Sequence, residues 1–243
     1  MIKFFRKIRY DLLEKNKTGK YLKYAIGEII LVVIGILIAL SINNWNENKK
    51  LRRVETEILK EVKANLENDL EGIRENLNHF KLKNKSENII INWIEGSESF
   101  NDSLSIHFNS IQFGVEFNYN VTPYETLKQM GMRTIKNDSL RNQIATLYDI
   151  NYEGYNRLIE YQNSYQSKIH DLEVKYFNEI GLLDLTIMKP ININGLRTDN
   201  DLMFRYKSFR NYNETFLEFF VPEIEIEIIK TIEMIDQELL MRN

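Results

Sequence analysis

The 243-residue chain contains no cysteine. Without thiols it has no disulfide bond, no thiolate zinc site, no cysteine nucleophile and no cysteine-ligated cluster. It is also poor in residues that interrupt helices and strands, with three prolines and ten glycines. This scarcity argues against a turn-rich all-β fold and against long disordered linkers.

The motifs of common enzyme classes are missing too. The sequence has no HExxH, GxGxxG, P-loop, GxSxG or EF-hand pattern. None of His79, His107 and His170 follows an acidic residue by three positions, so the Glu-x-x-His pattern of di-iron bundles is absent. Glu75 and His79 lie one helical turn apart and could form half a metal site, although such pairs are more often solvated contacts. We therefore expect no catalytic residue, no cofactor and no enzymatic activity.

Charge is distributed unevenly along the chain. Residues 1–24 hold eight Lys or Arg against two acidic residues, whereas residues 46–243 hold 24 basic and 32 acidic residues. Between them lies AIGEIILVVIGILIALSI, residues 25–42, in which Glu28 is the single charge. Because the long C-terminal part is acidic and its basic residues are dispersed, we expect no nucleic-acid binding.

The apolar run predicts a transmembrane helix over residues 21–45. From Tyr24 to Trp45 a helix measures roughly 33 Å, enough to cross a bilayer core of about 30 Å. The basic N-terminal flank predicts a cytoplasmic N-terminus in the inner membrane and a periplasmic C-terminal domain, residues 46–243. The alternative is a cleaved signal peptide, because residues 39–41 loosely fit a cleavage site.

Residues 1–20 form a basic segment with apolar residues at helical spacing. These apolar residues are Ile2, Phe5, Ile8 and Leu12. The pattern predicts a short amphipathic helix on the anionic inner leaflet of the lipid bilayer. The alternative is a disordered basic tail that only sets the topology.

Glu28 is the functional candidate within the span, because an intramembrane carboxylate is costly. It lies about 10 Å from the midpoint of the span at Gly35, so its side chain can reach the membrane interface and form a hydrogen bond there, which is a purely structural role. The sharper alternative is a proton-carrying acid, as in stator-like rods. Gly27, Gly35 and Ala39 share one helix face, which favours docking to a membrane protein partner or homo-oligomerisation through the span.

The chain begins with MIKFFRKIR and continues across the span as KYAIGEIILVVIGILIALSINNWNENKK. These segments resemble the N-terminal signature of a large family of uncharacterised single-pass membrane proteins from Bacteroidetes. The similarity is looser over residues 124–141, and Ser41 stands where members often carry Gln. The resemblance implies a Gram-negative inner-membrane location and supplies no activity, cofactor or catalytic residue.

Three apolar stripes with a period near 3.6 residues predict long helices over about 46–95, 138–180 and 199–241. The first continues directly from the span, although its stripe fades over residues 81–88. Asn137 to Ser139 and Asp199 or Asn200 are expected N-caps, and Gly96 and Gly181 are expected ends. Pro222 predicts a kink in the third helix, with a break as the alternative.

Two stretches between the long helices are less regular. Within residues 97–136, a short helix is expected from Pro123 to Gly131. Residues 105–117 fit a strand, a helix or a packed loop, and residues 186–197 read as a connection. The predicted fold is all-α: one N-terminal transmembrane helix continuing into an elongated antiparallel helical bundle.

The aromatic residues of the second helix give the remaining functional candidates. Tyr148, Tyr152, Tyr155 and Tyr165 recur along one helix. They fit an aromatic core, or the lining of a ligand cleft between helices. We expect a membrane-anchored periplasmic interaction or scaffold module. The alternatives are a ligand-sensing bundle that signals through a membrane partner and, third, a proton-linked rod that uses Glu28.

Overall fold

The computed structural model describes residues 18–241, without the side chains of Thr18, Lys20, Tyr21 and Tyr24. The amphipathic segment predicted from Ile2, Phe5, Ile8 and Leu12 lies outside the described residues. Within them, helices are the only regular structure apart from one isolated bridge between Phe177 and Pro190. The all-α prediction is confirmed. The chain divides into two compact units, Met1–Thr56 and Glu57–Asn243.

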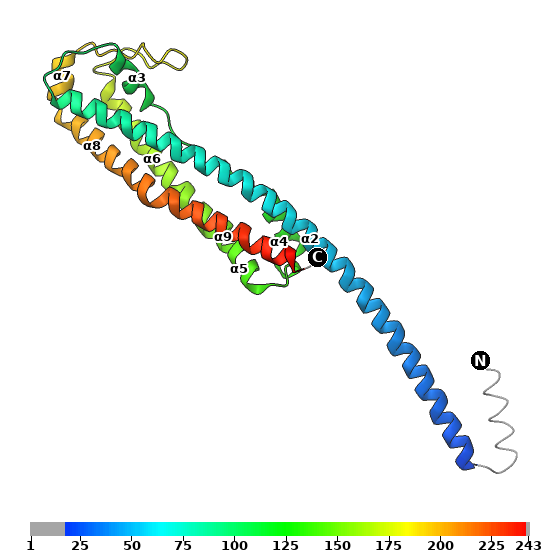
Figure 1. Cartoon of the computed structure of the whole chain (residues 1–243). Coiled ribbons are helices and arrows are strands. Elements are labelled where there is room, and N and C mark those ends of the chain that lie inside the picture. Colours follow the sequence, from blue (N-terminus) through cyan, green and yellow to red (C-terminus); the bar gives the residue numbers. More distant parts are fainter. Residues whose placement is uncertain (1–17, 242–243) are drawn as a thin grey trace. The chain divides into compact units, whose positions relative to one another are not determined.

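The first helix, α2, runs without interruption from Thr18 to Glu95 (Figure 1). No proline occurs among its 78 residues, so every turn can form its hydrogen bonds. It contains the one stretch in the described residues that is long and apolar enough to cross a membrane. The large apolar side chains from Ile26 to Ile42 are between 47% and 63% exposed. Such a continuous exposed apolar surface is typical of a membrane-spanning helix.

The second unit is built from three long helical segments. The first is the C-terminal part of α2, and the other two each consist of two α-helices joined by a π-helical turn. The second segment comprises α5 (Asp138–Thr146), η2 (Leu147–Tyr152) and α6 (Glu153–Glu173). The third comprises α8 (Asn200–Thr215), η3 (Phe216–Phe220) and α9 (Val221–Leu240). Shorter helices cover the connections: α3 (Ser103–Ser110), α4 (Thr122–Met130), η1 (Met132–Thr134) and α7 (Ile193–Thr198).

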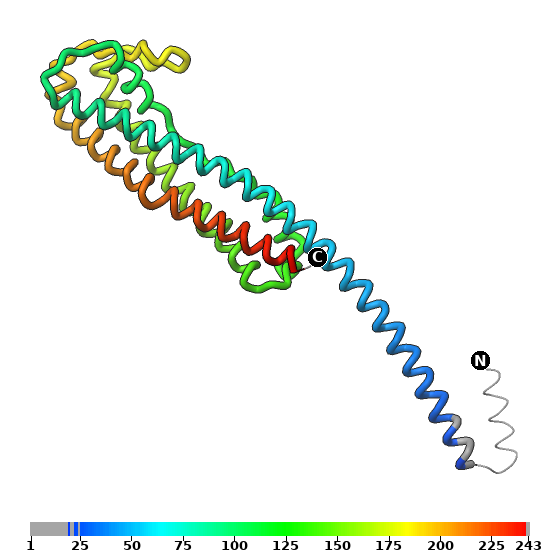
Figure 2. The backbone as a smooth tube through the Cα atoms, in the orientation of Figure 1, coloured from blue at the N-terminus to red at the C-terminus, as the bar shows by residue number. Residues whose placement is uncertain are grey.

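The three segments do not all alternate in direction. Three hydrogen bonds join α2 to η2 and α6 at a constant separation of 83 residues: Asn65 with Tyr148, Asp69 with Tyr152, and Lys83 with Gln166. A constant separation means that α2 and α6 run in the same direction. The third segment is antiparallel to α2, since Lys63 bonds to Asp236 and Arg74 to Glu225. Residues 96–137 lead the chain back from the end of α2 to the start of α5, so that the two helical segments can run in the same direction (Figure 2).

Capping side chains mark the beginnings of α5, α7 and α8. Asn137, Asn192 and Asp199 each accept a backbone N–H bond from the first turn of the following helix. Residues 186–197 therefore contain most of α7 rather than only a connection. Gly131, with φ of 92°, ends α4 in a conformation that favours glycine.

The second helix ends earlier than its sequence pattern suggests. It was expected to reach residue 180, yet α6 ends at Glu173. The chain then turns, Phe177 pairs with Pro190, and the Tyr176 hydroxyl donates to Asp199 at 2.6 Å. These contacts bury Tyr176 in a turn. Tyr176 therefore fits the apolar stripe because it is buried, although it does not belong to the helix.

The third segment remains helical across Pro222. Phe220 and Val221 both keep right-handed helical dihedral angles, so the alternative of a break at this proline is wrong. Proline has no N–H and its ring meets the carbonyl of the preceding turn. The π-helical turn η3 lies directly before α9 and accommodates this missing hydrogen bond.

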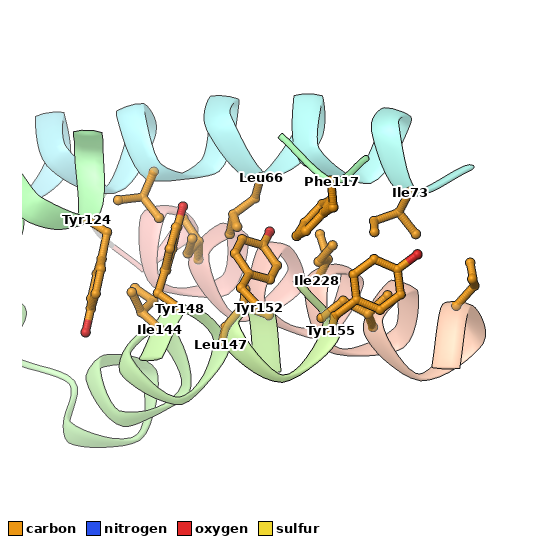
Figure 3. Close-up of a cluster of buried hydrophobic side chains, with 14 of the residues drawn as sticks. Leu66, Ile73, Phe117, Tyr124, Ile144, Leu147, Tyr148, Tyr152, Tyr155 and Ile228 are labelled. Atoms are coloured by element: carbon orange, nitrogen blue, oxygen red, sulfur yellow. The ribbon is translucent and has the colours of Figure 1, made fainter. Parts of the chain in front are cut away.

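Two hydrophobic cores lie along the bundle. The first core contains Leu66, Tyr152 and Phe216 among its buried residues, and Figure 3 shows part of it between α2, η2 and α9. The second core contains Trp93, Phe108 and Phe209. Both cores draw residues from all three long segments, so each one holds the segments together.

Replacing Phe216 with alanine tests the first core. Phe216 is fully buried and its ring stacks on Phe80 at 4.7 Å. The F216A variant should lose about 3–5 kcal/mol of unfolding free energy, because the cavity removes transfer energy and contacts. Denaturant unfolding of the full chain in detergent, followed by circular dichroism, measures the loss. Phe204, which is 68% exposed, is the matched control: F204A should change stability by about 0.5 kcal/mol or less. Equal effects of the two variants would contradict this core.

Candidate functional site

The tyrosines predicted for a ligand cleft lie mostly inside the first core. Tyr148, Tyr152 and Tyr155 are at most 4% exposed and point between the helices, as Figure 3 shows. The ring of Tyr148 stacks on Tyr124, whose centroid is 4.6 Å away. Tyr165 is half-buried and stacks on Phe209 at 5.8 Å in the second core. The aromatic-core alternative therefore describes these four residues.

Asp69 is the acidic centre of this aromatic cluster. Its Oδ2 atom accepts hydrogen bonds from the Tyr152 hydroxyl at 3.0 Å and from Asn65 Nδ2 at 3.1 Å. The same amide nitrogen of Asn65 donates to the Tyr148 hydroxyl oxygen at 3.1 Å. Burial raises the pKa of Asp69 to about 6, against the lowering effect of the bond from Tyr152. These polar groups satisfy one another, which is typical of a structural network.

After the π-helical turn η2, every second position of the buried face is displaced by one residue, while Tyr155, Gln162 and Ile169 are buried where the apolar stripe places them. Before the turn, Leu140, Ile144 and Leu147 are buried, as their spacing predicts. After it the buried positions include Tyr152, Ile159, Gln166 and Glu173. An uninterrupted stripe would instead place Asn151, Leu158, Tyr165 and Leu172 at the corresponding positions. One extra residue in the turn explains the displacement.

An open cleft of about 520 Å³ lies beside the two π-helical turns. One wall comes from η2 and α6 and the other from η3 and α9. The lining residues are Ile150, Asn151, Gly154, Tyr155, Arg157, Leu158, Tyr161, Phe220, Glu223 and Ile224. Its volume lies in the range of ligand sites. Of the four predicted tyrosines, Tyr155 lines it, and Tyr161 joins it from the same helix.

Exposed apolar side chains lie on the helices that form both walls of this cleft. Ile150 and Tyr161 are 63% and 56% exposed, and Phe219 and Ile226 are each 60% exposed. Phe219, Glu223 and Ile226 share one helix face by their spacing. We call these four apolar residues, together with Arg157 and Glu223, the cleft face. Sequence periodicity misses it, because single exposed apolar residues carry no signal of their own.

The charges of the cleft face have no partners nearby. Arg157 on α6 and Glu223 on α9 are exposed, and neither forms an ion pair or a side-chain hydrogen bond with any residue that the structure describes. Each wall therefore contributes one charge, of opposite sign. The cleft face offers apolar contact, one donor group and one acceptor group to whatever binds it.

A buried polar layer separates the first core from the second. All three long segments contribute to it, and its members are Lys83, Glu87, Gln162, Gln166 and Asn213. Lys83 Nζ donates to Gln166 Oε1 at 2.7 Å and to the Phe113 carbonyl at 2.9 Å. Asn213 receives a bond from Gln162 at 2.7 Å and donates to Glu87. Burial lowers the pKa of Lys83 and raises that of Glu87, while their mutual attraction opposes both shifts.

Glu173 is a second buried acid close to this layer. It accepts hydrogen bonds from the Tyr206 hydroxyl and from Gln112 Nε2, the latter at 3.1 Å. Burial raises the pKa of Glu173 to about 7, although both bonds and the charge of Lys83 lower it. One buried lysine faces two buried acids, so the charge of only one acid is offset. Burial therefore raises the pKa of both acids, and the attraction of Lys83 opposes each rise.

The raised pKa of Glu173 predicts a pH dependence of stability. Its folded pKa of about 7 exceeds the ordinary value of 4.5, so the folded chain binds the proton more tightly. The stabilising contribution of this group should therefore be complete below pH 4.5 and should be lost as the pH rises toward 7, by on the order of 3 kcal/mol. Glu173→Gln should flatten this fall between pH 5 and 7.5 in denaturant unfolding. The exposed Glu71→Gln variant is the control; identical slopes for both variants would refute the assignment.

The candidate residues of the span all lie on α2. Gly27, Glu28, Gly35 and Ala39 fall within its apolar stretch. A Cβ atom added to Gly27 or Gly35 would meet no atom within 4 Å. The structure thus leaves this helix face accessible, and its role in packing stays a prediction.

Glu75 and His79, the pair that could form half of a metal site, are both exposed on α2. Among the described residues, no group of three or more His, Cys, Asp or Glu is arranged to hold a metal ion. His170 lies elsewhere, with its Nε2 atom buried and unbonded in the described structure.

Comparison with known proteins gives one match. A family model described as "Family of unknown function (DUF6090)" matches residues 28–199, which is more than half of the chain. The match includes Glu28, most of the span, the polar residues Lys83 and Glu87, and the whole of α6. No curated protein and no solved structure matches.

Proposed function

The chain belongs to DUF6090, a family of unknown function, and we propose that it is a membrane-anchored interaction module whose binding surface is the cleft face. The observation that carries this proposal is the distribution of apolar side chains. Tyr148 and Tyr152 lie in the core, whereas Ile150, Tyr161, Phe219 and Ile226 are more than half exposed on the helices that form an open cleft. Exposed apolar groups rimmed by charge are typical of protein interaction sites.

A ligand-sensing bundle is the second candidate. It is favoured by the volume of the cleft and by Tyr155 and Tyr161 in its lining. An enclosed pocket would favour it further, but the cleft opens to solvent, as docking of a protein requires. The proton-linked role of Glu28 is third, and no geometry beyond its place in the span supports it. An enzymatic role is not proposed.

We place the anchor in the inner membrane of a Gram-negative bacterium, with the N-terminus in the cytoplasm and the bundle in the periplasm. The basic residues before the span support this orientation, because positive charge is retained on the cytoplasmic side. The resemblance of residues 1 to about 50 to single-pass proteins of Bacteroidetes supports the compartment.

A single introduced cysteine tests the orientation. The natural chain has no cysteine, and Leu183 is fully exposed, so Leu183→Cys provides one accessible thiol. A membrane-impermeant maleimide should label it in cells whose outer membrane alone has been permeabilised. Labelling that requires rupture of the inner membrane would contradict the periplasmic location. The mass of the labelled chain also separates an intact anchor from a mature chain that starts near residue 42.

Photo-cross-linking tests the interaction module. A photoreactive amino acid at Tyr161 or Phe219 of the full chain should give discrete protein adducts in membranes, because both positions lie on the cleft face. Leu82 on α2 is the matched control, since it is 67% exposed and apolar but lies away from the cleft. Adducts should be at least about tenfold more abundant from the cleft face. Absence of adducts from all three positions would refute the proposed function.

A further inference from the structure

We propose that the cleft face binds the cleft face of a second copy of this chain, in a two-fold symmetric contact. This inference rests on the proposed function, because it assigns a partner to the same surface. A two-fold contact uses one patch on both copies, so the patch must be complementary to itself. The cleft face meets this requirement in shape and in charge.

The complementarity in shape comes from a cavity that lies beside protruding side chains. The cleft of about 520 Å³ is bordered on one wall by Tyr161. Phe219 lies on η3, which forms part of the other wall, and it precedes the lining residue Phe220 in the sequence. Both Tyr161 and Phe219 are more than half exposed. In a two-fold contact these side chains from each copy can fill the cleft of the other, and aromatic residues in pockets dominate the energy of such contacts.

The complementarity in charge comes from Arg157 and Glu223. They lie on opposite walls of the cleft and have no ion-pair partner among the residues that the structure describes. A two-fold axis that runs along the cleft, between its two walls, sets Arg157 of each copy against Glu223 of the other. The contact therefore forms two equivalent ion pairs between these residues.

Other occupants explain these features less completely. A small ligand in the cleft would leave Phe219 and Ile226 exposed, because neither residue lines it. A different protein could also cover the cleft face. Its binding would not, however, explain why the two walls carry charges of opposite sign. Anchoring also favours a second copy, since confinement to one membrane raises the effective concentration of identical chains.

Charge reversal provides the test, with two tagged copies of the full chain expressed together and purified from detergent through one tag. When both copies carry Arg157→Glu, acid faces acid at both contacts, and when both carry Glu223→Arg, base faces base. Co-purification of the second tag should fall about tenfold in each case. When one copy carries Arg157→Glu and the other Glu223→Arg, both contacts become attractive again. This mixed pair should recover to within about threefold of the natural chain.

A second readout separates this contact from association through the span. Ile226→Cys in one copy and Tyr161→Cys in the other place single thiols on opposite walls of the cleft face, and a short bifunctional maleimide should join the two copies in membranes. Leu82→Cys, with similar exposure, should not cross-link. Adding Arg157→Glu to both copies should reduce the cross-link between Ile226→Cys and Tyr161→Cys about tenfold, while the circular dichroism of this exposed-site variant stays unchanged.

The outcomes distinguish the inference from the proposed function. A mixed pair that recovers no better than either single variant overturns the two-fold contact, as does co-purification without the cross-link between Ile226→Cys and Tyr161→Cys. If photo-cross-links from Tyr161 or Phe219 then identify another protein, the interaction module stands and the identity of its partner changes. If these positions give no adduct of any kind, both proposals fail.

Discussion

The buried polar layer is the constraint on which the rest of the bundle depends. Lys83 and Glu87 cannot leave the interior without breaking their bonds to Gln166 and Asn213, and these residues come from different long segments. Apolar cores tolerate sliding, because one aliphatic contact replaces another at similar cost. A buried charge with specific partners does not, because displacement by one turn leaves it unpaired. The layer therefore fixes the relative register of the three segments.

Once the register is fixed, the two π-helical turns determine what reaches the surface. The turns η2 and η3 each place residues in the first core and in the lining of the cleft. Tyr152 enters the core and Ile150 remains outside, while Phe216 enters and Phe219 remains outside. The same turns that complete the core therefore create the apolar cleft face beside it.

Much of the fold follows from the sequence, and the exceptions have physical causes. The apolar stripes predict an all-α bundle, and the cap at Asn137 and the end of α4 at Gly131 follow from local chemistry. The apolar stripe fades over residues 81–88 because the buried polar layer lies there. A single sequence does not, however, reveal which residues pair with Lys83. Periodicity also cannot locate a one-residue π insertion, so Tyr165 was placed with the core residues and Gln166 was not. The cleft face depends on these insertions, and therefore only the structure reveals it.

The shared direction of α2 and α6 has a consequence for the order of folding. The hydrogen bonds that join α2 to the second long segment each span 83 residues of the chain. Because the N-terminal part of a chain is synthesised first, the apolar stripe of α2, including Leu66 and Ile73, is not fully covered until the second and third segments have followed it. The antiparallel pair formed by α6 and α8 is joined by a much shorter loop, so it closes sooner. The helix that is made first is thus the last to be enclosed.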